Sequence, residues 1–123
     1  MDSASLVADA AARLLRDFCD PQTVNRAPDD GWKASAWVGL ERAGLTLAWV
    51  PEEFGGTPVD PASEARTFAM VSEEIARGDS GLADKLVQIW KISKLLANIA
   101  PRHLQERWFP RIVEDPTFLL AHC

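Results

Sequence analysis

The chain has 123 residues, of which 47% are hydrophobic and 25% charged, and its formal net charge is -5 at pH 7. This length suits one domain that buries a core without disulfides or metals. The negative charge argues against nucleic-acid binding, and no apolar run approaches the roughly 20 residues that cross a bilayer. Two distant cysteines, Cys19 and Cys123, predict neither a disulfide framework nor a zinc site. Without a secretory signal pattern at its N-terminus, the sequence predicts a cytoplasmic protein with reduced thiols.

The first two predicted helices cover residues 5–19 and 32–43, separated by a loop rich in proline, asparagine and aspartate. In the first, the spacing predicts a buried stripe of Leu6, Ala10, Leu14 and Phe18, widened by Val7, Ala11 and Leu15. In the second, Trp37 and Leu40 face inward together with Ala43 or Ala36, and Gly44 ends the helix in the left-handed conformation. Residues 45–50 then read as extended apolar chain.

A dense turn signal follows at Trp49-Val50-Pro51-Glu52-Glu53-Phe54-Gly55-Gly56. Pro51 fixes one backbone dihedral, whereas Gly55 and Gly56 permit positive φ values that other residues disfavour. The segment therefore predicts a rigid corner. Its adjacent carboxylates, Glu52 and Glu53, are interpreted as solvent-facing turn residues and not as an acid/base pair.

The third and fourth predicted helices cover residues 61–77 and 80–100. Asp60-Pro61 is a strong start signal for the third, which buries Phe68, Val71 and Ile75 and exposes a Glu73–Arg77 pair. The fourth is apolar around most of its circumference, with only a narrow polar stripe. A helix of this kind needs cover from several directions, so we expect further structure to pack on it.

The last part of the chain predicts a fifth helix over residues 101–108, another turn over 110–113, and a strand over 117–123. The sequence thus predicts an all-α fold of five to six helices over residues 1–116. Residues 117–123 are expected to be the first strand of a second, β domain.

Several motifs, in this order and spacing, resemble the N-terminal helical domain of acyl-CoA dehydrogenases and its passage into the central β domain. They are Trp37-x-x-Leu40, Ala43-Gly44-Leu45, Val50-Pro51-Glu52-Glu53-Phe54-Gly55-Gly56, Ser72-Glu73-Glu74-Ile75-Ala76-Arg77-x-Asp79, Arg107-Trp108-Phe109-Pro110-Arg111-Ile112, Glu114-Asp115-Pro116 and Phe118-Leu119-Leu120-Ala121-His122-Cys123. The resemblance covers about residues 32–123.

This resemblance implies an FAD-dependent enzyme, in its complete form usually a homo-oligomer, that oxidises the α,β bond of an acyl-CoA thioester. It also implies a central β domain and a C-terminal helical bundle that carries the catalytic glutamate, so no catalytic residue and no metal ligand is expected within these 123 residues. His122 and Cys123 stand where flavin contact begins in the family. Val87, Trp90 and Lys91 would approach the acyl chain, although ordinary core packing is the alternative for all three. The chain alone is expected to be inactive.

Two other functions stay open from the sequence. The apolar fourth helix and the terminal strand would also suit a stand-alone helical interaction module, because exposed apolar surface of this kind marks interfaces. A non-catalytic subunit of a heteromeric dehydrogenase is the other. His122 lacks a neighbouring acid or nucleophile in the sequence, and His103 is interpreted as a surface residue.

Overall fold

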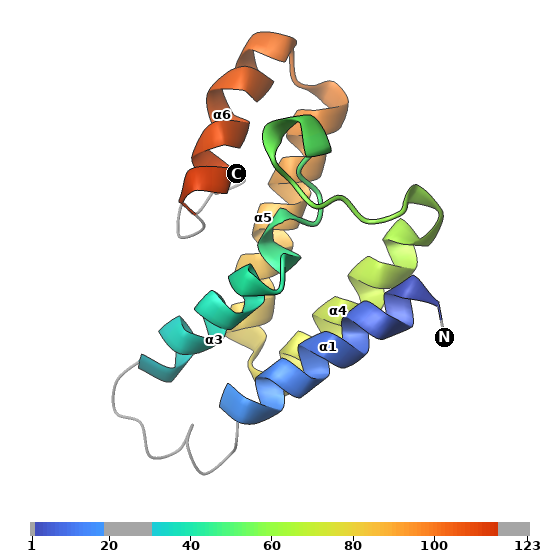
Figure 1. The fold of residues 1–123 in the computed structure, drawn as a ribbon, viewed down its shortest axis with the longest axis vertical. Helices are drawn as coiled ribbons and strands as arrows, with labels where there is room; N and C mark the ends of the chain where they lie inside the picture. Colours follow the sequence, from blue (N-terminus) through green and yellow to red (C-terminus); the bar gives the residue numbers. More distant parts are fainter. Residues whose placement is uncertain (1, 19–30, 116–123) are drawn as a thin grey trace.

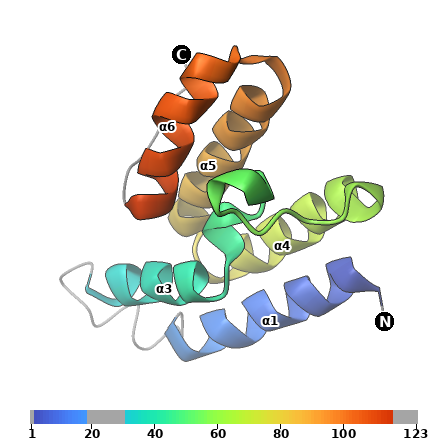
Figure 2. The same ribbon diagram turned by 45° about the horizontal axis from the view of Figure 1, so that its top comes forward.

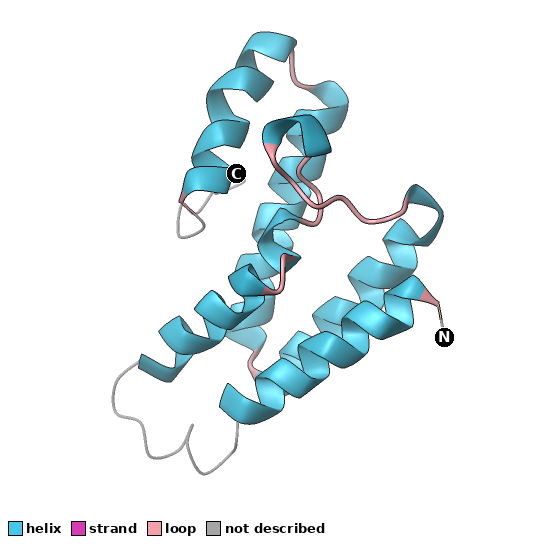
Figure 3. Ribbon diagram, viewed as in Figure 1, coloured by secondary structure: helices cyan, strands magenta, loops and turns pink. Residues whose placement is uncertain are grey.

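The computed structural model describes residues 2–18 and 31–115, which form helices joined by turns (Figures 1 and 3). The α-helices are α1 (Ser3–Phe18), α3 (Gly31–Arg42), α4 (Glu64–Gly78), α5 (Ser80–Ile99) and α6 (Arg102–Glu114), and the short 3₁₀ turns are η1 (Leu45–Leu47), η2 (Glu52–Phe54) and η3 (Pro61–Ser63). No strand occurs within these two described stretches. The predicted all-α class is confirmed. The predicted strand over 117–123 and most of the predicted loop lie outside the described residues.

Helix α1 packs along α4 and also contacts α3 (Figure 2). Its buried face is a row of small residues that ends in a leucine: Ala4, Ala8, Ala11 and Leu15. The predicted stripe is confirmed at Ala11 and Leu15 and wrong at Leu6, which is 54% exposed, and at Ala10, which is also exposed. Alanines let two helix backbones approach closely. The hydrophobic pattern alone does not tell whether a helix face packs through small residues at close distance or through large residues at a greater distance.

After α3 the chain turns at Gly44, whose φ of 76° lies in the left-handed region, as predicted. The predicted extended segment that follows is wrong. Leu45–Leu47 forms the turn η1, and the Leu47 carbonyl accepts hydrogen bonds from the amides of Val50 and Thr57. Successive turns direct neighbouring apolar side chains into the core, which the alternation of a strand would not allow.

The rigid corner over residues 51–56 is confirmed, with different roles for its two glycines. Gly55 has a φ of 89°, whereas a Cβ on Gly56 would lie 1.9 Å from the carbonyl oxygen of Val50. Gly56 is therefore required for a close backbone approach and not for a positive φ. The predicted exposure of Glu52 and Glu53 is confirmed.

Helices α4 and α5 form an antiparallel hairpin with Asp79 at its connection (Figure 1). Asp60 accepts a hydrogen bond from the amide of Ala62, which confirms the predicted start signal, and the Glu73–Arg77 ion pair is present at 2.7 Å. Asp79 has two functions. Its amide donates to the carbonyl of Ile75 at the end of α4, and its side chain accepts from the amide of Leu82 at the start of α5.

Helix α6 continues through Pro110, so the prediction of two separate pieces was wrong. Proline removes one helical hydrogen bond, but the buried side chains of Phe109 and Ile112 hold the backbone on both sides of it.

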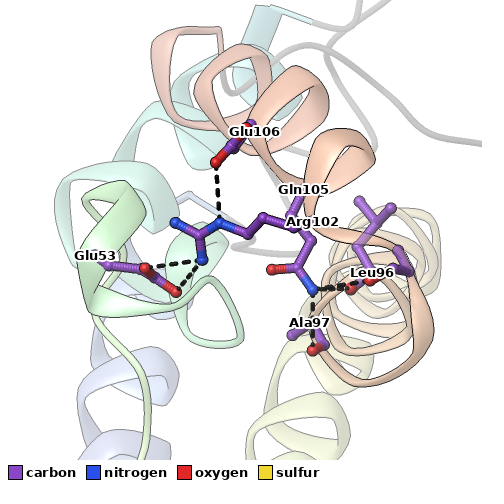
Figure 4. A network of polar contacts seen from close by, with 7 residues as sticks. Glu53, Leu96, Ala97, Arg102, Gln105 and Glu106 are labelled. Carbon is purple, nitrogen blue, oxygen red and sulfur yellow. Dashed lines mark hydrogen bonds and ion pairs between the residues drawn. The ribbon is translucent and has the colours of Figure 1, made fainter.

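At the start of α6, the Gln105 side chain donates hydrogen bonds to the carbonyls of Leu96, Ala97 and Ala100 at the end of α5 (Figure 4). Arg102, one turn earlier, contacts both carboxylate oxygens of Glu53 at 3.0 Å.

Candidate functional site

Three hollows follow one another along the line where α4 and α5 meet, here called the α4–α5 seam. The outer hollow, about 360 Å³, lies at the open end of the hairpin beside the corner. The middle hollow, about 280 Å³, includes Ala65 and Phe68 of α4. The inner hollow, about 420 Å³, is lined mostly by small residues near the α4–α5 connection, among them Ala69, Ser72, Ala76 and Ala83.

Aromatic rings form the floor of the middle hollow. Trp49 lies 4.6 Å from Trp90 and 6.0 Å from Phe68, measured between ring centroids, and Phe68 lies 5.5 Å from Trp90. Trp90 is only 1% exposed, and its Nε1 donates a hydrogen bond of 2.6 Å to the carbonyl of Leu45. The floor is therefore apolar and fixed in orientation, which suits contact with an apolar ligand.

An ion pair between Glu64 and Lys94 spans the seam next to this floor. Oε1 of Glu64, on α4, accepts a hydrogen bond of 2.9 Å from Trp49 Nε1 and forms an ion pair with Nζ of Lys94, on α5. The hydrogen bond from Lys94 and, next, the one from Trp49 lower the pKa of Glu64 below its ordinary value of 4.5, although partial burial opposes the shift. Glu64 is therefore ionised at neutral pH, and with Lys94 it lines both the outer and the middle hollow.

A further groove of about 400 Å³ lies on α5 beside the seam and shares Lys91 and Lys94 with the middle hollow. Its apolar residues are Ile92, Leu95 and Ile99, at helical spacing, and Leu95 and Ile99 are 46% and 71% exposed. The sequence predicted that this helix carries more apolar surface than a small bundle covers, and its C-terminal half does so.

The predicted substrate residues all lie on α5 along the seam. Trp90 and Lys91 line the middle hollow, and Val87 lines the inner hollow one turn earlier. His122 and Cys123 lie outside the described residues. Sequence reasoning missed Trp49, Glu64 and Lys94 as members of this site, because they come from three elements and no local pattern indicates that they meet.

The comparison with protein families decides the family of the chain. The model of the acyl-CoA dehydrogenase N-terminal domain matches residues 1–115. The chain belongs to this family. Neither the search of curated proteins nor the search of solved structures gives a match.

The acyl-CoA dehydrogenase family implies a flavin, and the described part of this N-terminal domain does not fit one. The indole N–H groups of Trp49 and Trp90 are already bonded, and the carboxylate of Glu64 is paired. Two buried hydroxyls without a hydrogen-bond partner, those of Thr46 and Ser93, are not among the residues that line the three hollows. We therefore derive no catalytic step from these residues.

The described residues of the acyl-CoA dehydrogenase N-terminal domain also offer no cluster of three or more potential metal ligands. Among the same residues, no helix is both long and apolar enough to span a membrane. What the α4–α5 seam can do is hold an apolar group against aromatic rings and exclude water from it.

Proposed function

We propose that this domain is the N-terminal part of a cytoplasmic, FAD-dependent acyl-CoA dehydrogenase that oxidises the α,β bond of acyl-CoA thioesters. Membership of the family supports the proposal. The flavin and the glutamate that takes the α proton would be held mainly by a central β domain and a C-terminal helical bundle. Residues 117–123 would begin that β domain, with His122 and Cys123 as its first flavin contacts, and the complete enzyme would be a homo-oligomer.

Within that enzyme, the α4–α5 seam would form one wall of the acyl cleft. The observation that carries this role is the alignment of Val87, Trp90 and Lys91 along one seam with an aromatic floor. An acyl chain lying there would gain about 0.8 kcal/mol for each methylene removed from water. The seam would bind the acyl chain and exclude water from it, and it would take part in no chemical step.

The exposed stripe of Ile92, Leu95 and Ile99 supports a contact with another part of the same protein. It equally supports the alternative of an interaction module, which would dock a partner through α5 without any flavin. The two proposals differ in whether the longest natural reading frame that contains this chain yields a flavoprotein.

Expression of that reading frame tests the proposal. The purified protein should contain FAD and should reduce an artificial electron acceptor only when acyl-CoA is added. A flavin-free protein that forms a defined complex through α5 would contradict the enzyme and support the module. Replacement of Ile99 by glutamate, at a 71% exposed position, should disturb assembly in either case, so the flavin content and the activity decide between them.

A further inference from the structure

We infer that Glu64 and Lys94 form a polar septum across the α4–α5 seam, and that this septum limits how far an acyl chain extends along it. The inference rests on the proposed cleft. Its basis is positional: the two side chains come from opposite walls, meet in an ion pair, and both line the outer and the middle hollow. Trp49 Nε1 donates a hydrogen bond to the same Glu64 carboxylate.

The two hollows that the septum separates are both suited to apolar groups. The middle hollow has the rings of Trp49, Phe68 and Trp90. The outer hollow, beyond the septum, includes Pro58, Val59, Pro61 and Ala97. A chain passing from one to the other would have to break the ion pair or cover it with hydrocarbon.

Both routes are unfavourable for an apolar chain. If hydrocarbon covers the ion pair, the pair loses solvation free energy that its own attraction does not fully replace. If the pair is broken, burial of a single charge costs still more free energy. Lys94 keeps about half of its side chain exposed and Glu64 about a quarter, so the pair is still partly solvated. An acyl chain that starts at the inner hollow should therefore stop at Glu64. The distance along α4 from Ala76, in the inner hollow, to Glu64 is roughly 18 Å at 1.5 Å per residue.

Removal of the septum should join the middle and outer hollows into one longer groove. Lys94→Met introduces an unbranched side chain one atom shorter than lysine, and it removes the charge. Glu64→Gln keeps an acceptor for the indole of Trp49 and weakens the bridge. Lys94→Arg should preserve the ion pair with Glu64. Lys85→Met, at an exposed position of α5 outside the three hollows, is the matched control for the loss of a lysine.

The experiment titrates the protein expressed from the longest natural reading frame that contains this chain with saturated acyl-CoA thioesters of increasing chain length. Dissociation constants come from NMR shifts of the tryptophan indole N–H groups, assigned by Trp→Phe variants. In the wild type, affinity should rise with chain length to a plateau, and the Trp90 resonance should respond. In Lys94→Met and Glu64→Gln the plateau should move to longer chains, with binding about fourfold tighter for each additional buried methylene. Lys94→Arg and Lys85→Met should keep the wild-type plateau.

An unchanged plateau in both Lys94→Met and Glu64→Gln, with binding to the seam intact, would overturn the septum and leave the proposed cleft standing. A wild-type protein of that reading frame whose indole resonances respond to no acyl-CoA of any length would contradict the role of the seam itself. Circular dichroism of each variant confirms that the helices are retained, so that a lost response is assigned to binding and not to unfolding.

Discussion

The rings of Trp49 and Trp90 lie with their centroids 4.6 Å apart and their planes tilted by 40°, and each indole N–H donates to a different element. Trp49 donates to Glu64 at the start of α4, and Trp90 donates to the carbonyl of Leu45 in η1. The pair therefore joins the turn after α3, the segment before the corner, α4 and α5. A contact of this kind fixes the orientation of the rings that form the floor of the middle hollow.

Replacement of Trp90 by phenylalanine should destabilise the chain by about 2–4 kcal/mol, since it leaves the Leu45 carbonyl without its donor and opens a small cavity. Urea unfolding followed by far-UV circular dichroism measures the loss. Trp108→Phe, at a partly exposed position on α6, should cost less and serves as the control. Equal losses in the two variants would contradict the importance of the buried indole hydrogen bond.

The two glycines of the corner should respond differently to alanine. Gly56→Ala places a Cβ 1.9 Å from the Val50 carbonyl oxygen, and the backbone must move, so we expect a loss of about 3 kcal/mol or more. Gly55→Ala meets only Val113, at 3.4 Å, and should cost about 1–2 kcal/mol for its positive φ. Thermal unfolding ranks the two variants, and a larger loss for Gly55→Ala would refute this assignment.

The Glu64 carboxylate should make stability depend on pH in the acid range. Its pKa is lower in the folded chain than its ordinary value of 4.5, because Lys94 and Trp49 bond to the ionised form. Its contribution is therefore complete above that value and is lost as the pH falls through the lower, folded pKa. Urea unfolding of Glu64→Gln should show a shallower decline below pH 4.5 than the wild type.

The Glu64 comparison isolates one carboxyl group. Asp2 also has a lowered pKa, chiefly through the hydrogen bond from the Ser5 amide, and it is present in both proteins. Parallel acid profiles in the wild type and in Glu64→Gln would show that the bridge to Lys94 and Trp49 adds nothing to stability.

The capping of α5 by Gln105 gives a further prediction (Figure 4). Gln105→Ala removes a donor from three carbonyls at the end of α5 and should cost about 1 kcal/mol. Gln105→Glu should be worse, because a carboxylate lies unfavourably beside the negative end of a helix dipole. Denaturant unfolding measures both variants, and Gln88→Ala on α5 is the control. Equal stability of the glutamate variant and the wild type would disprove the cap.

The exposed stripe on α5 should matter for association and not for folding of the isolated chain. Leu95→Ser and Ile99→Ser should each change the free energy of unfolding by no more than about 0.5 kcal/mol, since much of each side chain is already in water. Sedimentation velocity should show less self-association in the double variant. Leu6→Ser, at an exposed position on α1 away from the stripe, should leave association unchanged, and a loss equal to that of the double variant would rule out a specific surface.

Much of the helical fold was predictable because its signals are local. Asp60-Pro61 starts the third segment, Gly44 adopts the left-handed conformation, and the Glu73–Arg77 pair forms at the expected spacing. The errors have physical causes of another kind. The buried face of α1 depends on how closely α4 approaches, and α6 passes Pro110 because Phe109 and Ile112 are buried in the core.

The site was less predictable than the fold. Family resemblance directed attention to Val87, Trp90 and Lys91, but the bridge between Glu64 and Lys94 depends on two helices that run antiparallel and on a tryptophan from the corner. A charge-pair pattern within one helix can be found from spacing, whereas a pair between helices requires the tertiary structure.

The connection at Asp79 has a consequence for how this chain tolerates change in evolution. Because one residue ends α4 and begins α5, insertion or deletion of a single amino acid there would rotate α5 by about 100° relative to its partner. A deletion would bring Lys91, and an insertion Ile89, into the direction in which Trp90 now lies. Length variation at this position should therefore be rare among working homologues.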